Sequence, residues 1–236
     1  MTLEITTHRS VLIRILKDIY TDLEIAASLG FNGGTAALLF YNLDRFSVDL
    51  DFDILDASKE DLIFEKVKNI LEKYGSVKKA QIKRFCIFFL LSYDNKIQGA
   101  YNIKVEMNRR DFGSKYELKS HLGIPTKVMI REDMAAHKLV AMYEREGETS
   151  GDIFDVHFFL KNHWPINEEI IVKRTSMTMQ QFLQKCIDML QGMSNQTILS
   201  GIGELLDAQQ KRWVKDNLLN ETIFLLKLLL ESNQAN

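Results

Sequence analysis

The stretch SVDLDFDI, residues 47–54, decides the fold, because apolar and acidic side chains alternate along it without interruption. Successive side chains of a β-strand point to opposite faces. The pattern therefore predicts a strand over 48–55 with Asp49, Asp51 and Asp53 on one face. Residues two apart on a strand lie roughly 6.5 Å apart, so these carboxylates can converge on one hard cation, or on two that are about 3.5–4 Å apart. The alternative is a solvated edge strand without a bound ion.

A second polar strand face follows at residues 101–107, which read YNIKVEM. Alternation places Glu106 on this face together with Asn102 and Lys104. A lone glutamate on such a face is usually only hydrated, but beside an Asp-x-Asp strand Glu106 becomes a candidate third ligand. Ligands that are all oxygen favour Mg²⁺ or Mn²⁺ over zinc.

A Gly-Gly-Thr turn, made by Gly33, Gly34 and Thr35, precedes a predicted short helix over 35–41. Paired glycines let backbone N–H groups approach a phosphate, and a helix N-terminus favours anions. Most Gly-Gly pairs are ordinary turns. The combination of this turn, a short helix and then RFSVDLD at 45–51 is much more specific.

These residues carry a resemblance. The segments GGTAAL at 33–38 and DRFSVDLDF at 44–52 resemble the nucleotidyltransferase AbiEii/AbiGii toxin family, part of the polymerase-β-like nucleotidyltransferase superfamily. The segments KLVAMYER at 138–145 and DIFD at 152–155 are similar to the family's Lys-x-x-Ala-x-x-x-Arg and Asp-x-x-Asp stretches. Family members commonly carry a basic residue before the first Asp of Asp-x-x-Asp, whereas this chain has Gly151 there.

The resemblance implies an α/β fold with a small mixed sheet, followed by a C-terminal helical bundle. It implies transfer of a nucleoside monophosphate from an NTP to an acceptor hydroxyl, with Mg²⁺ or Mn²⁺ as cofactor. The implied metal ligands are Asp49, Asp51 and Glu106, which with Lys138 and Asp155 form the catalytic set. The implied nucleotide-binding residues are Gly33, Gly34, Thr35, Arg45, Ser47, Arg145 and Asp152. The family also suggests a bacterial toxin, with a tRNA acceptor and a cognate antitoxin as partners.

Two predicted helices support this assignment because each carries charged residues on an otherwise apolar face. Lys138 lies within the apolar stripe of a helix over 132–146. A buried, unpaired ammonium is costly, so Lys138 should meet an acid or a bound anion, unless its stem packs and its head reaches water. Asp152 and Asp155 share a face of the next predicted helix. An ion pair between Lys138 and Asp155, or between Arg145 and Asp152, is an alternative to a catalytic role, and both can hold together.

Elsewhere the pattern alternates between helical and strand-like segments. Further helices are predicted over 8–29, 59–74, 152–162, 166–175, 178–192 and, with one or two breaks, 203–231. Further strands are predicted over 77–84, 85–93, 99–108 and 126–130. Trp164-Pro165 is the predicted boundary between a nucleotidyltransferase domain, 1–165, and a C-terminal helical region, 166–236.

Composition excludes several classes. The chain has 236 residues, of which 46% are hydrophobic, so disorder is not expected. Two cysteines rule out a disulfide framework and suit a reducing cytoplasm. The sequence opens without the basic segment of a signal peptide, and no apolar run reaches the length of a membrane span. There is neither a P-loop nor a Gly-x-Ser-x-Gly motif, and the histidines form no metal pattern.

The charge is unevenly distributed. Residues 1–77 carry a local charge of −5 and residues 78–131 one of +8. A phosphate backbone attracts such an excess, so we expect an RNA acceptor to bind across 78–131. Its clustered cations are Lys78, Lys79, Lys83, Arg84, Arg109 and Arg110. The alternative is that these side chains pair with the acidic N-terminal region of the same molecule.

Two other functions compete with nucleotidyl transfer. A catalytically inactive nucleotide- or RNA-binding protein could keep the fold, but it has no need for three clustered carboxylates. A metal-dependent phosphohydrolase could use the same carboxylates, and analysis of the products would distinguish it.

Overall fold

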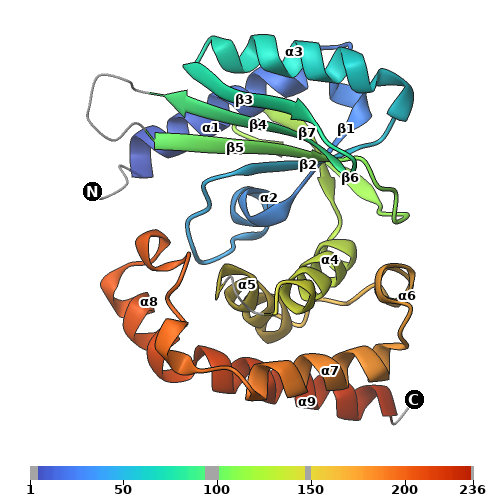
Figure 1. Ribbon diagram of the computed structural model, residues 1–236, viewed down its shortest axis with the longest axis vertical. Helices are drawn as coiled ribbons and strands as arrows, with labels where there is room; N and C mark the ends of the chain where they lie inside the picture. The colour runs from blue at the N-terminus through green and yellow to red at the C-terminus, as the bar shows by residue number, and fades with distance from the viewer. Residues whose placement is uncertain (1–4, 94–100, 147–149, 235–236) are drawn as a thin grey trace. The chain divides into compact units, whose positions relative to one another are not determined.

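A computed structural model describes residues 5–93, 101–146 and 150–234 (Figure 1). The chain forms two compact units. The first contains Met1–Asp111 and Lys115–Met129, and the second contains Phe112–Ser114 and Ile130–Asn236. The predicted boundary at Trp164-Pro165 falls inside the second unit, because the two helices after Ile130 pack with the C-terminal helices.

The first unit is built on one mixed sheet of seven strands within the described residues, in the order β3-β4-β5-β2-β1-β7-β6. β2 runs parallel to β5 and β1 runs parallel to β7, whereas the other neighbours are antiparallel. The strands are β1 (Leu29–Asn32), β2 (Leu50–Ile54), β3 (Ser76–Ile82), β4 (Cys86–Tyr93), β5 (Tyr101–Asn108), β6 (Tyr116–His121) and β7 (Ile124–Met129).

Helices cover both faces of this sheet. α1 (Ile5–Thr21) and α3 (Glu60–Glu72) lie on one face and α2 (Gly33–Tyr41) lies on the other (Figure 1). Alternation turns Leu50 and Phe52 of β2 toward the core, where they are fully buried. The opposite side chains of β2, which include the predicted carboxylates, therefore face the α2 side of the sheet.

Two strands were not predicted. The predicted helix over 8–29 is wrong at its end, since α1 stops at Thr21 and residues 29–32 form β1. Leu29 and Phe31 are fully buried in the sheet, and Gly30 lies directly under the Tyr116 ring, where no side chain fits. β6 is an edge strand with mostly polar residues, so it lacks an apolar period. The first two residues of the predicted strand over 99–108 lie outside the described residues.

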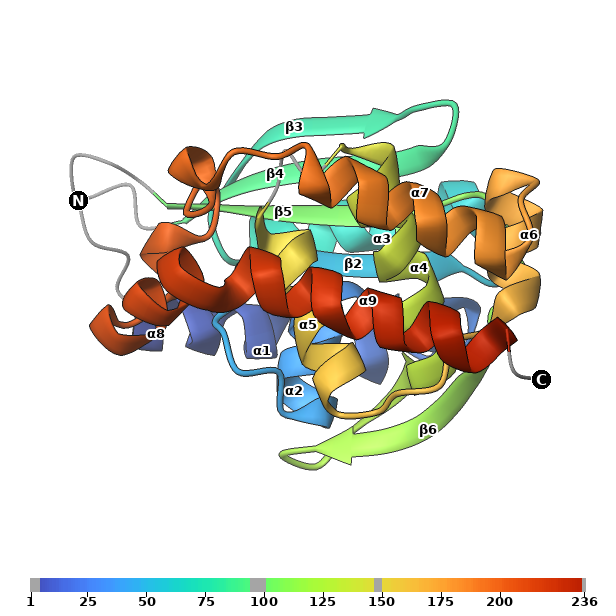
Figure 2. The same ribbon diagram turned by 90° about the horizontal axis from the view of Figure 1, so that it is seen from below.

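The second unit is helical. Its helices are α4 (Arg131–Glu144), α5 (Ser150–Lys161), α6 (Glu168–Thr175), α7 (Met179–Gln191), α8 (Ala208–Trp213) and α9 (Leu219–Gln234), with a π-helical turn over Val214–Leu218. Short 3₁₀ turns occur in the two units at Ala26–Ser28, Ala57–Lys59, Asn195–Thr197 and Gly203–Leu205. α7 and α9 lie side by side (Figure 2). A capping box between Thr178 and Gln181 starts α7.

No helix in the described part of the chain combines the length and the apolarity that a membrane span requires.

Candidate active site

The predicted carboxylates lie on adjacent strands of the first unit. β2 and β5 pair in parallel, with Asp51 directly opposite Glu106. Cross-strand neighbours share a face, so both side chains lie on the α2 side of the sheet. Asp49 precedes β2 and its Oδ1 accepts a hydrogen bond of 3.1 Å from the backbone N–H of Lys104 on β5. The structure thus places Asp49, Asp51 and Glu106 on one sheet face.

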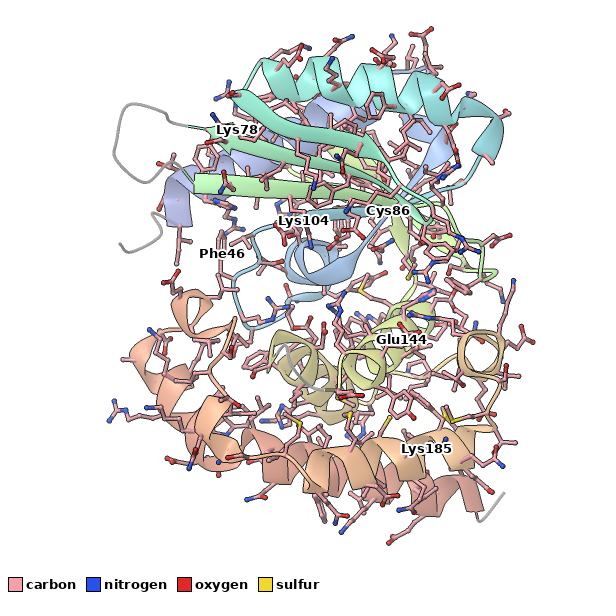
Figure 3. The ribbon with its side chains drawn as sticks, in the orientation of Figure 1. Phe46, Lys78, Cys86, Lys104, Glu144 and Lys185 are labelled. Atoms are coloured by element: carbon pink, nitrogen blue, oxygen red, sulfur yellow. The ribbon has the colours of Figure 1, made fainter. Side chains whose placement is uncertain are left out.

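Lys104 supplies a positive charge among these carboxylates. Its Nζ lies 3.5 Å from Asp49 Oδ2, and its side chain lies on the side of the sheet away from α3 (Figure 3). Burial acts to lower the pKa of Lys104, but the charges of Asp51, Asp49 and Glu106 outweigh it and hold that pKa above its ordinary value. Lys104 was assigned no role from the sequence, because its partners come from another strand.

The third aspartate of β2 is engaged differently. Asp53 accepts a 2.8 Å hydrogen bond from Asn108 Nδ2 and another from the Tyr116 hydroxyl. These contacts tie β2 to β5 and to β6. Asp53 is therefore a structural carboxylate, whereas Asp49 and Asp51 face the glycine turn and Lys104.

The glycine turn packs directly against this carboxylate face. Gly33 has φ +76°, a conformation that favours glycine, and a Cβ at this position would overlap the Asp51 side chain. A Cβ at Gly34 would lie 2.9 Å from Ser47 Oγ and 3.0 Å from the Arg45 guanidinium. The turn that begins α2 therefore fits between Asp51 and the segment before β2.

Two buried hydroxyl groups fix this arrangement. The Thr35 hydroxyl donates to the backbone carbonyl of Asp49 and lies 2.9 Å from Ser47 Oγ. Both residues are buried. They hold the turn against the Asp49 segment, while Asn32, which precedes α2, makes no capping hydrogen bond with its side chain. The N-terminal N–H groups of α2 are thus not occupied by that cap.

His8 is a site-supporting residue that sequence reasoning missed. Its Nε2 lies 2.9 Å from the Val48 carbonyl and its Nδ1 lies 2.6 Å from the Tyr93 hydroxyl. Burial lowers the pKa of His8, although the Val48 hydrogen bond and the Asp49 charge act in the opposite direction. His8 therefore links the chain just before Asp49 to the end of β4. A single histidine on a predicted helix gave no signal of this role.

The other predicted residues meet in the second unit. Lys138 Nζ lies 3.0 Å from Asp152 Oδ1 and 3.1 Å from Asp155 Oδ2, and Arg145 donates to Asp152 Oδ2 at 2.9 Å. The Lys138 side chain is 16% exposed and Asp155 is fully buried. Lys138 thus meets acids inside the unit rather than extending into water. Both ion pairs considered from the sequence, Lys138 with Asp155 and Arg145 with Asp152, are present.

One Ser–His contact in the second unit resembles a catalytic nucleophile–base pair, but the histidine tautomer does not allow it to act as a base. Ser114 Oγ lies 2.7 Å from His137 Nε2, while the Arg174 guanidinium, which only donates, lies 3.0 Å from His137 Nδ1. Nδ1 must therefore accept a hydrogen bond, so Nε2 carries the hydrogen and donates a hydrogen bond to the Ser114 hydroxyl. The imidazole cannot activate this hydroxyl as a base, which agrees with the absence of a hydrolase motif.

Among the described residues, no group of three or more His, Cys, Asp or Glu side chains is already close enough to hold one metal ion. The chemistry of the donors nevertheless fits a hard divalent cation. Asp49, Asp51 and Glu106 offer only carboxylate oxygens, and one ammonium, that of Lys104, offsets part of their charge. The three candidate ligands include no histidine or cysteine, which favours a hard cation over zinc.

The structure thus brings together an Asp-x-Asp strand, a third carboxylate and a Gly-Gly helix start packed on Asp51, which is the arrangement that the resemblance to the nucleotidyltransferases implies. The family model for the nucleotidyl transferase AbiEii toxin of type IV toxin–antitoxin systems matches residues 14–217. The chain therefore belongs to this family and is a nucleotidyltransferase.

Solved structures share the fold. JHP933 from Helicobacter pylori is 20% identical, with a TM-score of 0.57 over 100% of this chain and 98% of the other. An H. pylori protein assigned to the nucleotidyltransferases is 19% identical, with a TM-score of 0.63 over 100% and 98%. MenT4, the nucleotidyltransferase toxin Rv2826c from Mycobacterium tuberculosis, is 19% identical, with a TM-score of 0.51 over 93% and 91%. No protein of curated function matches the sequence.

Proposed function

We propose that this nucleotidyltransferase moves a nucleoside monophosphate from a Mg²⁺–NTP complex (or Mn²⁺–NTP) to a hydroxyl of an RNA acceptor, with tRNA as the first candidate, and acts as a toxin in the cytoplasm. The observation that carries the proposal is the juxtaposition of Asp51 with Glu106 on one side and Gly33 on the other. The proposed metal ligands and the proposed phosphate-binding turn are thereby neighbours on one face of the sheet.

Asp49, Asp51 and Glu106 would hold the divalent cation. When bound, the ion lowers the pKa of the acceptor hydroxyl and neutralises charge on the triphosphate. The backbone N–H groups of Gly33 and Gly34 would bind the phosphates at the start of α2. Their position is fixed by Thr35 and Ser47, whose hydroxyls meet behind the turn.

Two cations would complete phosphate recognition. The Arg45 guanidinium lies against Gly34, where it would offset the charge of the leaving diphosphate. Lys138 in the second unit, whose ammonium pairs with Asp152 and Asp155, would contact phosphate charge. Arg145 and Asp152 would bind the nucleotide, and Asp155 would orient it or accept the proton of the acceptor.

Incubation with each α-labelled NTP, Mg²⁺ and total RNA tests the proposal. We expect label in RNA with the wild-type chain and none with Asp51→Asn. Asp53→Asn is the matched control, because Asp53 lies on the same strand and face but is held by Asn108 and Tyr116. Full activity of Asp51→Asn would contradict the assignment of the metal site. Hydrolysed NTP without labelled RNA would instead identify a phosphohydrolase.

Growth provides a second readout for the toxin assignment. Expression of the wild-type chain in a bacterial host should slow growth, and Asp51→Asn should not. A cognate antitoxin is the expected partner, since the family belongs to type IV toxin–antitoxin systems. Equal growth with both variants would contradict the toxic role while leaving the transferase activity open to the labelling assay.

A further inference from the structure

Aromatic rings and cations lie together on β3, on β4, in the turn between them and just after β5, next to Glu106. Phe88 of β4 lies directly opposite Glu106 in the antiparallel ladder, so it shares the carboxylate face. Lys83 Nζ lies 4.1 Å and Lys79 Nζ 5.7 Å from the centre of the Phe88 ring. The guanidinium carbons of Arg84 and Arg110 lie 4.9 Å and 5.3 Å from the centre of the Phe85 ring. We refer to these six residues as the aromatic platform.

The platform is accessible. Phe85 is 49% exposed and Phe88 is half-buried, whereas the four cations of the platform are exposed. In the described part of the chain, the recorded salt bridges do not include Lys79, Lys83 or Arg84. Their positive charge is therefore directed to solvent rather than to a carboxylate of the same molecule.

Arg109 shows the contrast within the same basic segment. Its guanidinium donates to both carboxylate oxygens of Glu60, at 2.7–3.0 Å, and to the backbone carbonyls of Lys83 and Arg84. Arg109 thus ties the β3–β4 turn to α3, as the intramolecular alternative from the sequence required. The excess charge of this segment divides into a structural arginine and the exposed cations of the platform.

The position of the platform relative to Asp51 suggests what binds there. Phe88 and Asp51 are separated by β5 alone, so their backbones lie about 10 Å apart, two strand spacings. Gly33 lies against Asp51 on the opposite, β1 side. Attacking and leaving oxygens lie roughly in line across the transferred phosphoryl group. If phosphates leave on the glycine side, the acceptor approaches from the side of Glu106 and Phe88.

We propose that the aromatic platform binds the single-stranded end of the RNA acceptor, with bases stacked on Phe88 and Phe85 and phosphates paired with Lys79, Lys83, Arg84 and Arg110. This inference rests on the proposed function. Aromatic rings bind the faces of unpaired bases, and a groove of cations follows the backbone. A duplex hides its base faces, and a single NTP needs no such extended surface.

Fluorescence anisotropy with a labelled single-stranded RNA of about 12 nucleotides, within the range of single-strand site sizes, tests the stacking. Stacking contributes about 1–3 kcal/mol per base, so Phe88→Ala should weaken RNA binding at least fivefold. Phe88→Tyr keeps the ring and should bind like the wild type. Phe224→Ala, an exposed phenylalanine of α9, is the matched control and should have no effect.

Salt dependence tests the cations. Each phosphate contact on a single strand contributes a slope of about −0.7 to log K against log salt. The double variant Lys79→Gln/Lys83→Gln should therefore reduce the slope by about 1.4. Lys17→Gln/Lys68→Gln removes the same charge from α1 and α3, on the other face of the sheet, and should leave the slope unchanged. An unchanged slope in the Lys79/Lys83 variant would contradict phosphate binding at the platform.

The remaining outcomes separate this inference from the proposed function. RNA labelling with an unchanged KM for RNA in Phe88→Ala and in the lysine variant would overturn the platform and leave the transferase intact. Weakened RNA binding in these variants, without any transfer to RNA by the wild type, would support the platform and contradict the RNA acceptor. A raised KM for NTP with unchanged RNA affinity would assign the rings to the nucleotide and overturn the inference.

Discussion

Each unit contains a lysine surrounded by carboxylates, and the two clusters differ in charge balance and burial. In the second unit, Lys138 and Arg145 formally balance Asp152 and Asp155, and Asp155 is fully buried. In the first unit, Lys104 faces three carboxylates across a partly exposed surface, where its side chain is 37% exposed. The first cluster therefore retains negative charge for a cation, whereas the formal charges of the second balance one another.

Removing the lysine of the buried cluster should have the largest effect. Lys138→Met keeps the volume of the side-chain stem but leaves Asp155 and Asp152 without their ammonium. Breaking a buried pair on one side costs about 3–5 kcal/mol, so we expect the free energy of unfolding to fall by this amount and activity to fall at least tenfold. Denaturant unfolding monitored by circular dichroism measures the loss.

Arg145→Met is the control for this cluster, because the Arg145 side chain is 56% exposed. An exposed ion pair contributes at most about 1 kcal/mol, so its loss should be small. If Lys138→Met were as stable as Arg145→Met, the network would not be the element that holds α4 to α5. The buried Lys138 would then contribute no more to the free energy of unfolding than the exposed Arg145.

Removing the lysine of the exposed cluster should act on metal binding instead. Lys104→Met should change the free energy of unfolding by no more than about 1 kcal/mol. It should tighten Mg²⁺ binding in the presence of NTP by roughly tenfold, because a nearby positive charge opposes a second cation by a few kcal/mol at most. Mg²⁺ titration followed by thermal shift measures this. Weaker Mg²⁺ binding in Lys104→Met would show that the ammonium contributes to the loaded site.

The two clusters also differ in how far the sequence predicted them. Asp49, Asp51 and Glu106 were found because a strand's two-residue period is a local signal, and the structure pairs their strands. The Lys138–Asp155 and Arg145–Asp152 pairs were predicted from helical spacing, whereas the contact of Lys138 with Asp152 was not. Lys104 and His8 were missed, because their roles arise from contacts between strands or from a residue 40 positions away, at Val48. β1 was missed because its four residues are too few to show a two-residue period, and its first residue falls at the end of the predicted helix over 8–29.

A smaller effect concerns His8, which supports the exposed cluster. Its pKa is lowered by burial in the folded chain, so the unfolded chain binds a proton more readily. The contribution of His8 to stability is present above about pH 6.5 and is lost as the pH falls through the lower folded value. In His8→Gln, the free energy of unfolding should fall less steeply from pH 7.5 to pH 5.5 than it does in the wild type. The two slopes should differ by less than about 1.4 kcal/mol per pH unit.

His157 provides the comparison in the second unit, because burial also lowers its pKa while Glu221 opposes the shift. The groups that face His8 are the Tyr93 hydroxyl and the Asp49 carboxylate. Unfolding curves of wild type, His8→Gln and His157→Gln at both pH values separate the two contributions. A His8→Gln curve that follows the wild type at both values would contradict the buried, neutral assignment of His8.

The two cysteines offer the smallest and most local test. Cys186 is fully buried in α7, and burial raises its pKa to about 12. Cys86 (labelled in Figure 3) is partly exposed at the start of β4, two residues before Phe88 of the aromatic platform. Its pKa is raised by burial and then by the Glu106 charge. The thiolate is the reacting form, so we expect iodoacetamide to modify Cys86 slowly and Cys186 only after unfolding.

Single-stranded RNA at saturation should protect Cys86 severalfold, because bases stacked on Phe88 cover its neighbour on the same strand face. Mass spectrometry of alkylated peptides, with Cys186 as internal reference, measures both rates. Equal modification of Cys86 with and without RNA would place the bound strand away from Glu106, and would remove the link between the exposed carboxylate cluster and the platform.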